Sequence, residues 1–188
     1  MNKSKYYPSI ITLIFASMAC SIFIGGPEFP AQTVSYSPEE VQTMRLQFEQ
    51  ALITGAETGV VTLQITEAQL TAYMAEKLSQ NTNPPFTDPQ ILLRDGQMQM
   101  YGKITRGWFN ANMLITMNVG VDETTGQPKI EIASADVGPI PAPEGINSAI
   151  SAIISEAYTG TLGPIAVGFR LESIAIADGI MTLTGRIK

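Results

Sequence analysis

The chain has no histidine and a single cysteine, Cys20, among its 188 residues. These scarcities exclude a disulfide within the chain, a zinc site built from cysteine and histidine, and a histidine-based catalytic triad. Only 15% of the residues are charged while 45% are apolar, which excludes a disordered chain and a coiled coil. A net charge of −6 also argues against a nucleic-acid partner. The composition instead predicts an ordinary folded domain with a hydrophobic core.

The sequence also lacks the short motifs that carry chemistry. It contains no glycine-rich phosphate loop, no nucleophile elbow and no calcium-binding loop. Among its seventeen carboxylates, Glu39 and Glu40 suit the start of a helix, and Asp95 and Asp178 suit turns. We therefore predict that the protein is not an enzyme, has no catalytic residue and uses no metal or cofactor.

The N-terminus combines a basic start with a short apolar run. Residues 1–9 contain Lys3 and Lys5, and an uncharged apolar stretch follows from Ile10 to Ile24. This stretch of about fifteen residues is shorter than the roughly twenty residues that a membrane-spanning helix needs. A basic start before a short apolar run is typical of an export signal, so we predict that the protein leaves the cytoplasm.

Cys20 lies inside this apolar run, directly after the Ala-Ser-Met-Ala sequence of residues 16–19. The stretch resembles the lipobox of bacterial lipoproteins, in which a small residue precedes a cysteine that is lipidated and becomes N-terminal after cleavage. The resemblance implies that residues 1–19 are a signal peptide and that Cys20 carries the lipid. Labelled palmitate would then be incorporated at Cys20. The protein would then sit on the outer face of the bacterial cell membrane. An uncleaved anchor and ordinary signal cleavage remain open alternatives.

Removal of residues 1–19 leaves nine basic and seventeen acidic residues, a net charge of −8. Anionic lipid does not attract such an acidic body, so the membrane must be bound through the anchor. Residues 25–37 contain glycine, proline and polar residues without periodicity, which predicts a tether. Residues 20–37 are therefore assigned to the lipidated N-terminus and its tether. Residues 38–188 remain for a single domain.

Three elements are predicted between positions 37 and 80. Ser37 as an N-cap, the proline after it and an apolar stripe at spacings of three and four predict a helix that ends near Gly55. Alternating apolar residues over 61–65 predict a half-buried strand. Thr66 and Gln69 form a capping-box pattern, which predicts that a second helix begins there.

Two fifteen-residue segments of the chain are similar to each other. Residues 91–105 and 174–188 share six identical positions, including the Asp-Gly pairs that begin at Asp95 and Asp178. Asp-Gly between alternating strands is a strong hairpin signal, because a two-residue turn needs positive φ angles. A predicted strand and helix precede each hairpin, at 60–66 and 67–80 in the first case and at 129–137 and 144–159 in the second. We therefore predict a β-α-β-β unit that occurs twice, although any two Asp-Gly hairpins share some similarity.

The clearest alternation of the chain runs from Phe109 to Val121. Every second side chain is apolar, and the other face carries mostly asparagine and threonine. This pattern predicts a strand of an antiparallel sheet with one face toward water. The proline-rich residues 138–143 then interrupt the sheet. The fold class is thus predicted as α+β, with a curved antiparallel sheet packed on helices.

Methionine is frequent, and six of the nine methionines fall on predicted inward faces. Thioethers are flexible and polarizable, so they tolerate irregular or exchangeable apolar neighbours. We predict that these side chains line a groove for a lipid or another apolar ligand. The candidate lining residues are Met74, Met98, Met100, Phe109, Met113, Ile115, Met117, Met181, Leu183 and Ile187. The alternative is that they simply fill the core of a stable domain.

Three stretches resemble a known group of bacterial envelope proteins. The strand that runs into a helix at Val61–Leu70, the Gly138–Pro141 turn and the closing hairpin around Asp178 resemble the YpmS-like and LmeA-like proteins. Those families are related to the tubular lipid-binding (TULIP) superfamily, in which a highly curved antiparallel sheet wraps a long helix. The resemblance covers roughly residues 38–188 and implies an exported, membrane-anchored protein that binds a lipid or other amphiphile, without catalytic residues. The open alternative is a structural or assembly module of the cell envelope, which recruits a protein partner through the polar face of the sheet.

Overall fold

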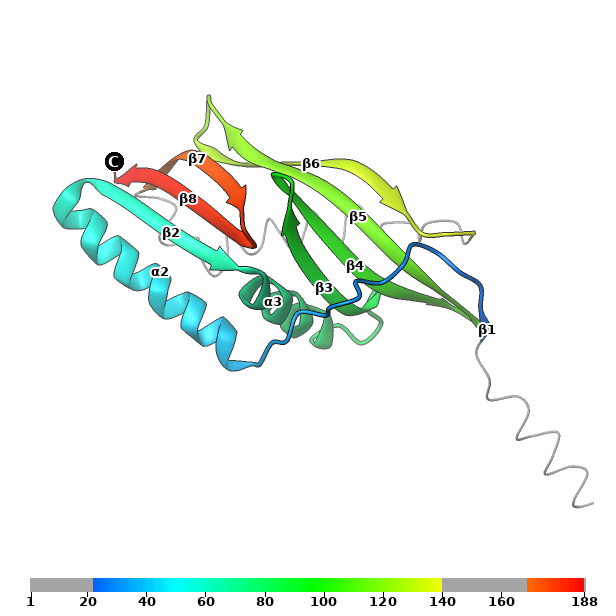
Figure 1. Cartoon of the computed structure of the whole chain (residues 1–188). Coiled ribbons are helices and arrows are strands. Elements are labelled where there is room, and N and C mark those ends of the chain that lie inside the picture. Colours follow the sequence, from blue (N-terminus) through cyan, green and yellow to red (C-terminus); the bar gives the residue numbers. More distant parts are fainter. Residues whose placement is uncertain (1–21, 140–168, 188) are drawn as a thin grey trace, which may run out of the picture.

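The computed structural model describes residues 22–139 and 169–187 (Figure 1). The helices in these residues are α2 (Glu39–Thr58) and α3 (Glu67–Ser79). The strands are β1 (Ile22–Phe23), β2 (Val60–Thr66), β3 (Thr87–Arg94), β4 (Gln97–Arg106), β5 (Phe109–Asp122), β6 (Gln127–Asp136), β7 (Phe169–Ala177) and β8 (Ile180–Ile187). The helix predicted at 144–159 lies outside the described residues.

The strands form two hydrogen-bonded sheets. The larger sheet has the order β1-β5-β4-β3, with β6 also paired to β5, and the smaller sheet has the order β2-β8-β7. Among the strand pairs of the described residues, the pairing of β1 with β5 alone is parallel, so the larger sheet is mixed. Together the strands curl around a shared apolar interior, against which α2 and α3 pack (Figure 1). The prediction of an α+β fold with a curved sheet is confirmed.

Both predicted hairpins are present, but they belong to different sheets. Asp95 and Asp178 each have φ of 53°, and the glycine that follows each of them has φ of 75°. The β3–β4 hairpin lies in the larger sheet and the β7–β8 hairpin in the smaller one, so the expectation of one continuous sheet is wrong. The strand before each hairpin pairs outside its own unit: β2 pairs with β8, and β6 pairs with β5. The first unit is therefore not a separate structural module, since its strand β2 pairs with β8 of the second unit.

Helix α3 explains why β3 does not continue into the smaller sheet. The N–H groups of Ile91 and Leu93 point away from β4, toward the free edge of β3. The Thr71 hydroxyl accepts the Ile91 N–H at 3.0 Å, and the Glu67 carboxylate accepts the Leu93 N–H at 2.7 Å. Unpaired N–H groups at a sheet edge either recruit another strand or need other acceptors. Two side chains of α3 therefore close this edge of the larger sheet.

Helix α2 differs from its prediction at both ends. Pro38 rather than Ser37 occupies the N-cap position, and the helix passes through Gly55 to end at Gly59, which has φ of 77°. Gly55 is buried, and a β-carbon there would collide with the side chain of Val61 on β2. This glycine therefore permits close packing of α2 on β2 and does not end the helix. The capping box predicted at the start of α3 is confirmed.

Residues 22–37, which we call the N-terminal strap, lie along the larger sheet. Strand β1 occupies the part of the β5 edge that β6 does not reach. The Ile22 N–H donates to the Trp108 carbonyl at 2.6 Å, and the Asn112 N–H donates to the Gly25 carbonyl at 3.0 Å. The Asn112 side chain then donates to the Pro27 carbonyl at 3.0 Å. The strap thus starts as an added strand and then turns onto the outer face of the sheet.

Further along the strap, three contacts hold it to β4 and β3. The Phe29 ring meets Tyr101 edge-on with 5.9 Å between centroids, and the Lys103 ammonium lies 5.6 Å from the Phe29 centroid. The Val34 N–H donates to the Gln90 side chain at 2.6 Å. The described part of the predicted tether is therefore bound to the domain. It also covers part of the sheet face that the sequence places in water.

Candidate functional site

Six methionines gather in the interior between the two sheets and the two helices. They come from α3, β4, β5 and β8, and each is 0–6% exposed: Met74, Met98, Met100, Met113, Met117 and Met181. On β4 and β5 they occupy alternate positions of one face, and strand pairing places Met98 opposite Met117 and Met100 opposite Ile115. Because side chains alternate between the two faces of a strand, the paired strands place thioethers side by side. The predicted inward orientation of the six methionines is confirmed.

The other four candidate residues divide into two groups. Ile115 is 0% exposed within the same cluster, and Leu183 is partly buried and packs against it. Phe109 is 46% exposed and Ile187 is 37% exposed, so the prediction that they face the interior is wrong. Phe109 begins β5 at the free end of the β4–β5 hairpin, and Ile187 is the last residue of β8. Alternation assigns a face to each of them, but each lies at the end of a strand, where its side chain is exposed.

Three buried polar side chains of the described residues, Gln69, Thr71 and Gln90, have structural partners. Gln69 belongs to the capping box and also donates to the Gln47 side chain at 2.8 Å. Thr71 accepts the N–H of β3 described above, and Gln90 accepts the N–H of the strap. Tyr73 is also buried and carries a hydroxyl, and apart from these four residues no side chain with a polar or charged group is buried in the described part of the chain. The interior formed by the described residues is therefore held together mainly by hydrophobic and dispersion contacts.

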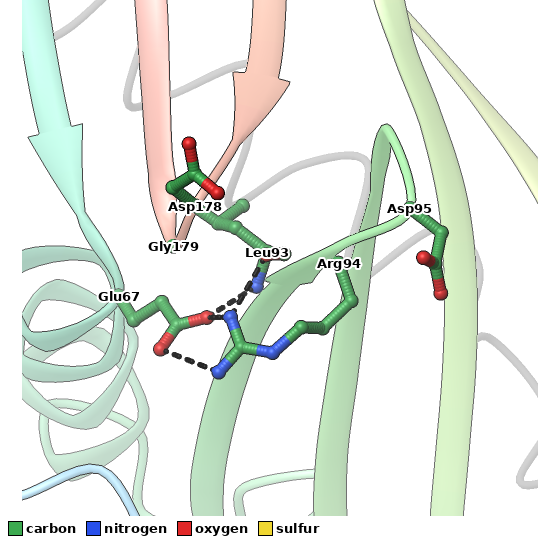
Figure 2. Close-up of a pocket in the computed structure, with 6 residues that line it drawn as sticks. All are labelled: Glu67, Leu93, Arg94, Asp95, Asp178 and Gly179. Carbon is green, nitrogen blue, oxygen red and sulfur yellow. Dashed lines mark hydrogen bonds and ion pairs between the residues drawn. The ribbon is translucent and has the colours of Figure 1, made fainter.

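A hollow of about 420 Å³, the seam hollow, opens at the surface where the two hairpin turns approach each other (Figure 2). Its lining residues are Glu67, Leu93, Arg94, Asp95, Asp178 and Gly179. The Arg94 guanidinium pairs with both oxygens of the Glu67 carboxylate, which also accepts the Leu93 N–H. Figure 2 shows the carboxylates of Asp95 and Asp178 pointing away from this pair. The charges at the centre of the hollow are therefore already partnered.

A second hollow, of about 370 Å³, lies between α2 and β2. Its lining residues are Gln47, Gln50, Ala51, Thr54, Val60 and Thr62. Neither hollow is lined by a methionine. Within residues 22–139 and 169–187, no group of three or more His, Cys, Asp or Glu side chains is placed to hold a metal ion. No helix in these residues has the length and hydropathy that crossing a membrane requires.

Two features of the surface escaped the sequence analysis. The ion pair between Glu67 and Arg94 joins positions 27 residues apart, and no local pattern announces it. The exposed apolar side chains at the end of the β4–β5 hairpin had a visible signal, because Trp108 directly follows Gly107 and precedes the predicted strand that starts at Phe109. Cys20, the predicted lipidation site, lies outside the described residues, two positions before β1.

Asp122, in the β5–β6 turn, provides a test of the local electrostatics. Its carboxylate accepts the N–H groups of Thr125 and Thr124, both at 2.9 Å, and the Thr125 bond is the main reason that the pKa of Asp122 is lowered. A lowered folded-state pKa stabilises the turn above the ordinary value of about 3.9 and loses that effect as the pH falls through the folded value. We expect the amide proton shifts of both threonines to titrate below that ordinary value. In D122N, whose side-chain oxygen still accepts, this titration should vanish; its persistence would assign it to another group.

No protein-family model matches the chain, and no curated protein matches it in sequence. An interpretation of its function therefore depends on the geometry described above and on the N-terminal sequence.

Proposed function

We propose that the protein is a membrane-anchored bacterial lipoprotein of the outer face of the cell membrane, whose α+β domain binds a lipid or another apolar ligand without catalysis. The observation that carries the ligand proposal is the gathering of six methionines, from one helix and three strands, in one shared interior. Methionine has three rotatable bonds and a polarizable sulfur, so a cluster of methionines adapts to differently shaped apolar partners. The resemblance to YpmS-like and LmeA-like envelope proteins implies the same class of ligand.

The division into two sheets supports access to this interior. Strand β3 is held at its free edge by side chains of α3 and not by a ladder to β7. Separating two sheets that share no ladder breaks fewer backbone hydrogen bonds than opening a continuous sheet. The seam between the hairpins is therefore a place where the interior could open to admit an acyl chain without breaking a strand ladder.

Native mass spectrometry of the full chain, purified from membranes in mild detergent, tests the ligand. We expect a non-covalent mass increment in the range of a lipid, which is released by organic solvent and identified in the extract. A chain that carries only its covalent N-terminal modification would contradict the ligand proposal.

Metabolic labelling with palmitate tests the anchor. We expect the wild-type chain to incorporate the label and C20S to lose it, because Cys20 is the only thiol of the chain. Equal labelling of both chains would remove Cys20 as the lipidation site. If neither chain is labelled and residues 1–19 are still attached, the N-terminus is an uncleaved anchor. If neither chain is labelled and residues 1–19 are absent, the signal peptide is removed by ordinary cleavage.

A second candidate is a structural or assembly module of the cell envelope with a filled core. It is favoured by the tight burial of the methionines and by the absence of methionine from the lining of both hollows. Such a module would recruit a protein partner through the outer sheet face that the strap leaves uncovered. The same mass measurement separates the two candidates, since a filled core retains no lipid.

A further inference from the structure

Four large apolar side chains are exposed together at the free end of the β4–β5 hairpin. Ile22 is 55% exposed, Phe23 61%, Trp108 51% and Phe109 46%. Strand β1 holds them together, because Ile22 lies opposite Phe109 and donates its N–H to the Trp108 carbonyl. We call these four residues the aromatic tip. Figure 1 shows β1 and this hairpin end at the opposite side of the molecule from the end of α2 and the C-terminal strand.

The hairpin that carries the tip also differs in charge from the rest of the chain. Residues 96–121 contain Lys103 and Arg106 but none of the seventeen carboxylates. Arg106 is exposed directly before the turn, and it forms no ion pair with the residues that the structure describes. Lys103 is ion-paired with Asp88 at 2.8 Å, so Arg106 is the cation that gives the surface beside the aromatic tip a local positive charge in a chain of net charge −6. Anionic lipid headgroups attract exposed basic residues of this kind.

The tip also lies next to the predicted membrane anchor. Ile22 and Phe23 are part of the uncharged apolar run that starts at Ile10, and Cys20 precedes β1 by two residues. Two residues span at most about 7 Å, so a lipid on Cys20 would hold the tip within that distance of its attachment point. Since β1 is hydrogen-bonded to β5, the domain cannot swing away from the membrane at this point.

We propose that the aromatic tip inserts into the lipid–water interface beside the anchor and fixes the orientation of the domain on the bilayer. The occupant of this surface is the membrane and not a protein partner. Tryptophan and other amphipathic rings concentrate at headgroup level, and an apolar contact next to a lipid chain provides the second attachment that stable anchoring needs. This inference rests on the anchor of the proposed function and adds the surface that touches the membrane.

Trp108 is the only tryptophan of the chain, so its fluorescence reports on the tip directly. The full lipidated chain is incorporated into vesicles of equal parts phosphatidylcholine and phosphatidylglycerol and recovered by flotation. We expect emission at shorter wavelength than in the urea-unfolded chain, protection from acrylamide, and stronger quenching by phosphatidylcholine brominated near the headgroup than by lipid brominated at the end of the chain.

Paired variants locate the contact. In F23S/F109S we expect the quenching by brominated lipid to fall by at least half, because two of the four inserted side chains lose their apolar surface. The control L46S/I53S removes two equally exposed side chains, 56% and 59%, from α2, and should leave the quenching unchanged. If the wild-type chain floats with the vesicles while Trp108 is quenched by acrylamide and not by brominated lipid, this result would contradict insertion of the aromatic tip but not the lipid anchor. A chain that does not float would overturn both.

Discussion

Replacing Met113 with alanine is expected to lower the free energy of unfolding by about 2–5 kcal/mol. Met113 is 0% exposed at the centre of the methionine cluster on β5, opposite Gly102 of β4. The truncation removes apolar contacts and leaves a cavity between parts of the fold that are fixed by strand pairing, so both the transfer cost and the cavity cost apply. Urea unfolding followed by circular dichroism measures the change.

Two variants control for this effect. M113L keeps most of the volume and should cost less than about 1.5 kcal/mol. M44A makes the same chemical change at a partly buried position of α2, where alanine also favours the helix, so its cost should be clearly smaller. Equal costs for M113A and M44A would mean that Met113 does not lie in a tightly packed interior.

The second large effect is expected at the edge of β3. E67A removes the acceptor of the Leu93 N–H, and T71V removes the acceptor of the Ile91 N–H. Leu93 and Ile91 are 0% and 2% exposed, so each orphaned N–H should cost about 1–3 kcal/mol of unfolding free energy. The two sites are neighbours on one edge, and their combined cost is therefore not a simple sum. Amide hydrogen exchange at these two positions, together with urea unfolding, measures the effect.

E67Q separates the two roles of this carboxylate. The amide oxygen can still accept the Leu93 N–H, whereas the ion pair with Arg94 is lost. The Arg94 side chain is 48% exposed, so the pair itself should contribute no more than about 1 kcal/mol. We expect E67Q to retain most of the stability that E67A loses. An equal loss in both variants would assign the effect to the ion pair with Arg94 instead of the strand edge.

An edge left open in E67A/T71V should also promote self-association.

The parts of the fold that could be predicted from the sequence are those set by neighbouring residues. The alternation along β5, the two Asp-Gly turns and the capping box of α3 each depend on residues within a few positions of one another. For the same reason, alternation identified the five buried methionines on strands, and helical spacing identified Met74 on α3. Local chemistry is sufficient to specify these features.

The remaining features depend on partners far apart in the sequence. Nothing within Val60–Thr66 indicates that this strand pairs with β8 across more than a hundred residues. The strap shows no periodicity because it is held by single contacts, such as the bond from Asn112 to the Pro27 carbonyl. The alternation of apolar residues along β5 also includes Phe109, although the side chain of Phe109 is exposed. Whether the end of a strand is covered depends on the elements that pack against it, so it cannot be predicted from the sequence of that strand alone.

The central claim, that an apolar ligand enters the methionine interior, is tested most directly by methyl NMR of the full chain. Methionine methyl groups labelled with carbon-13 are assigned through single Met-to-Leu variants, and phosphatidylglycerol is added to delipidated protein in deuterated detergent. We expect the signals of Met100, Met113 and Met117, all 0% exposed, to shift or split as the ligand binds beside them. Signals that stay unchanged in a chain that remains folded would contradict the claim and favour a filled core.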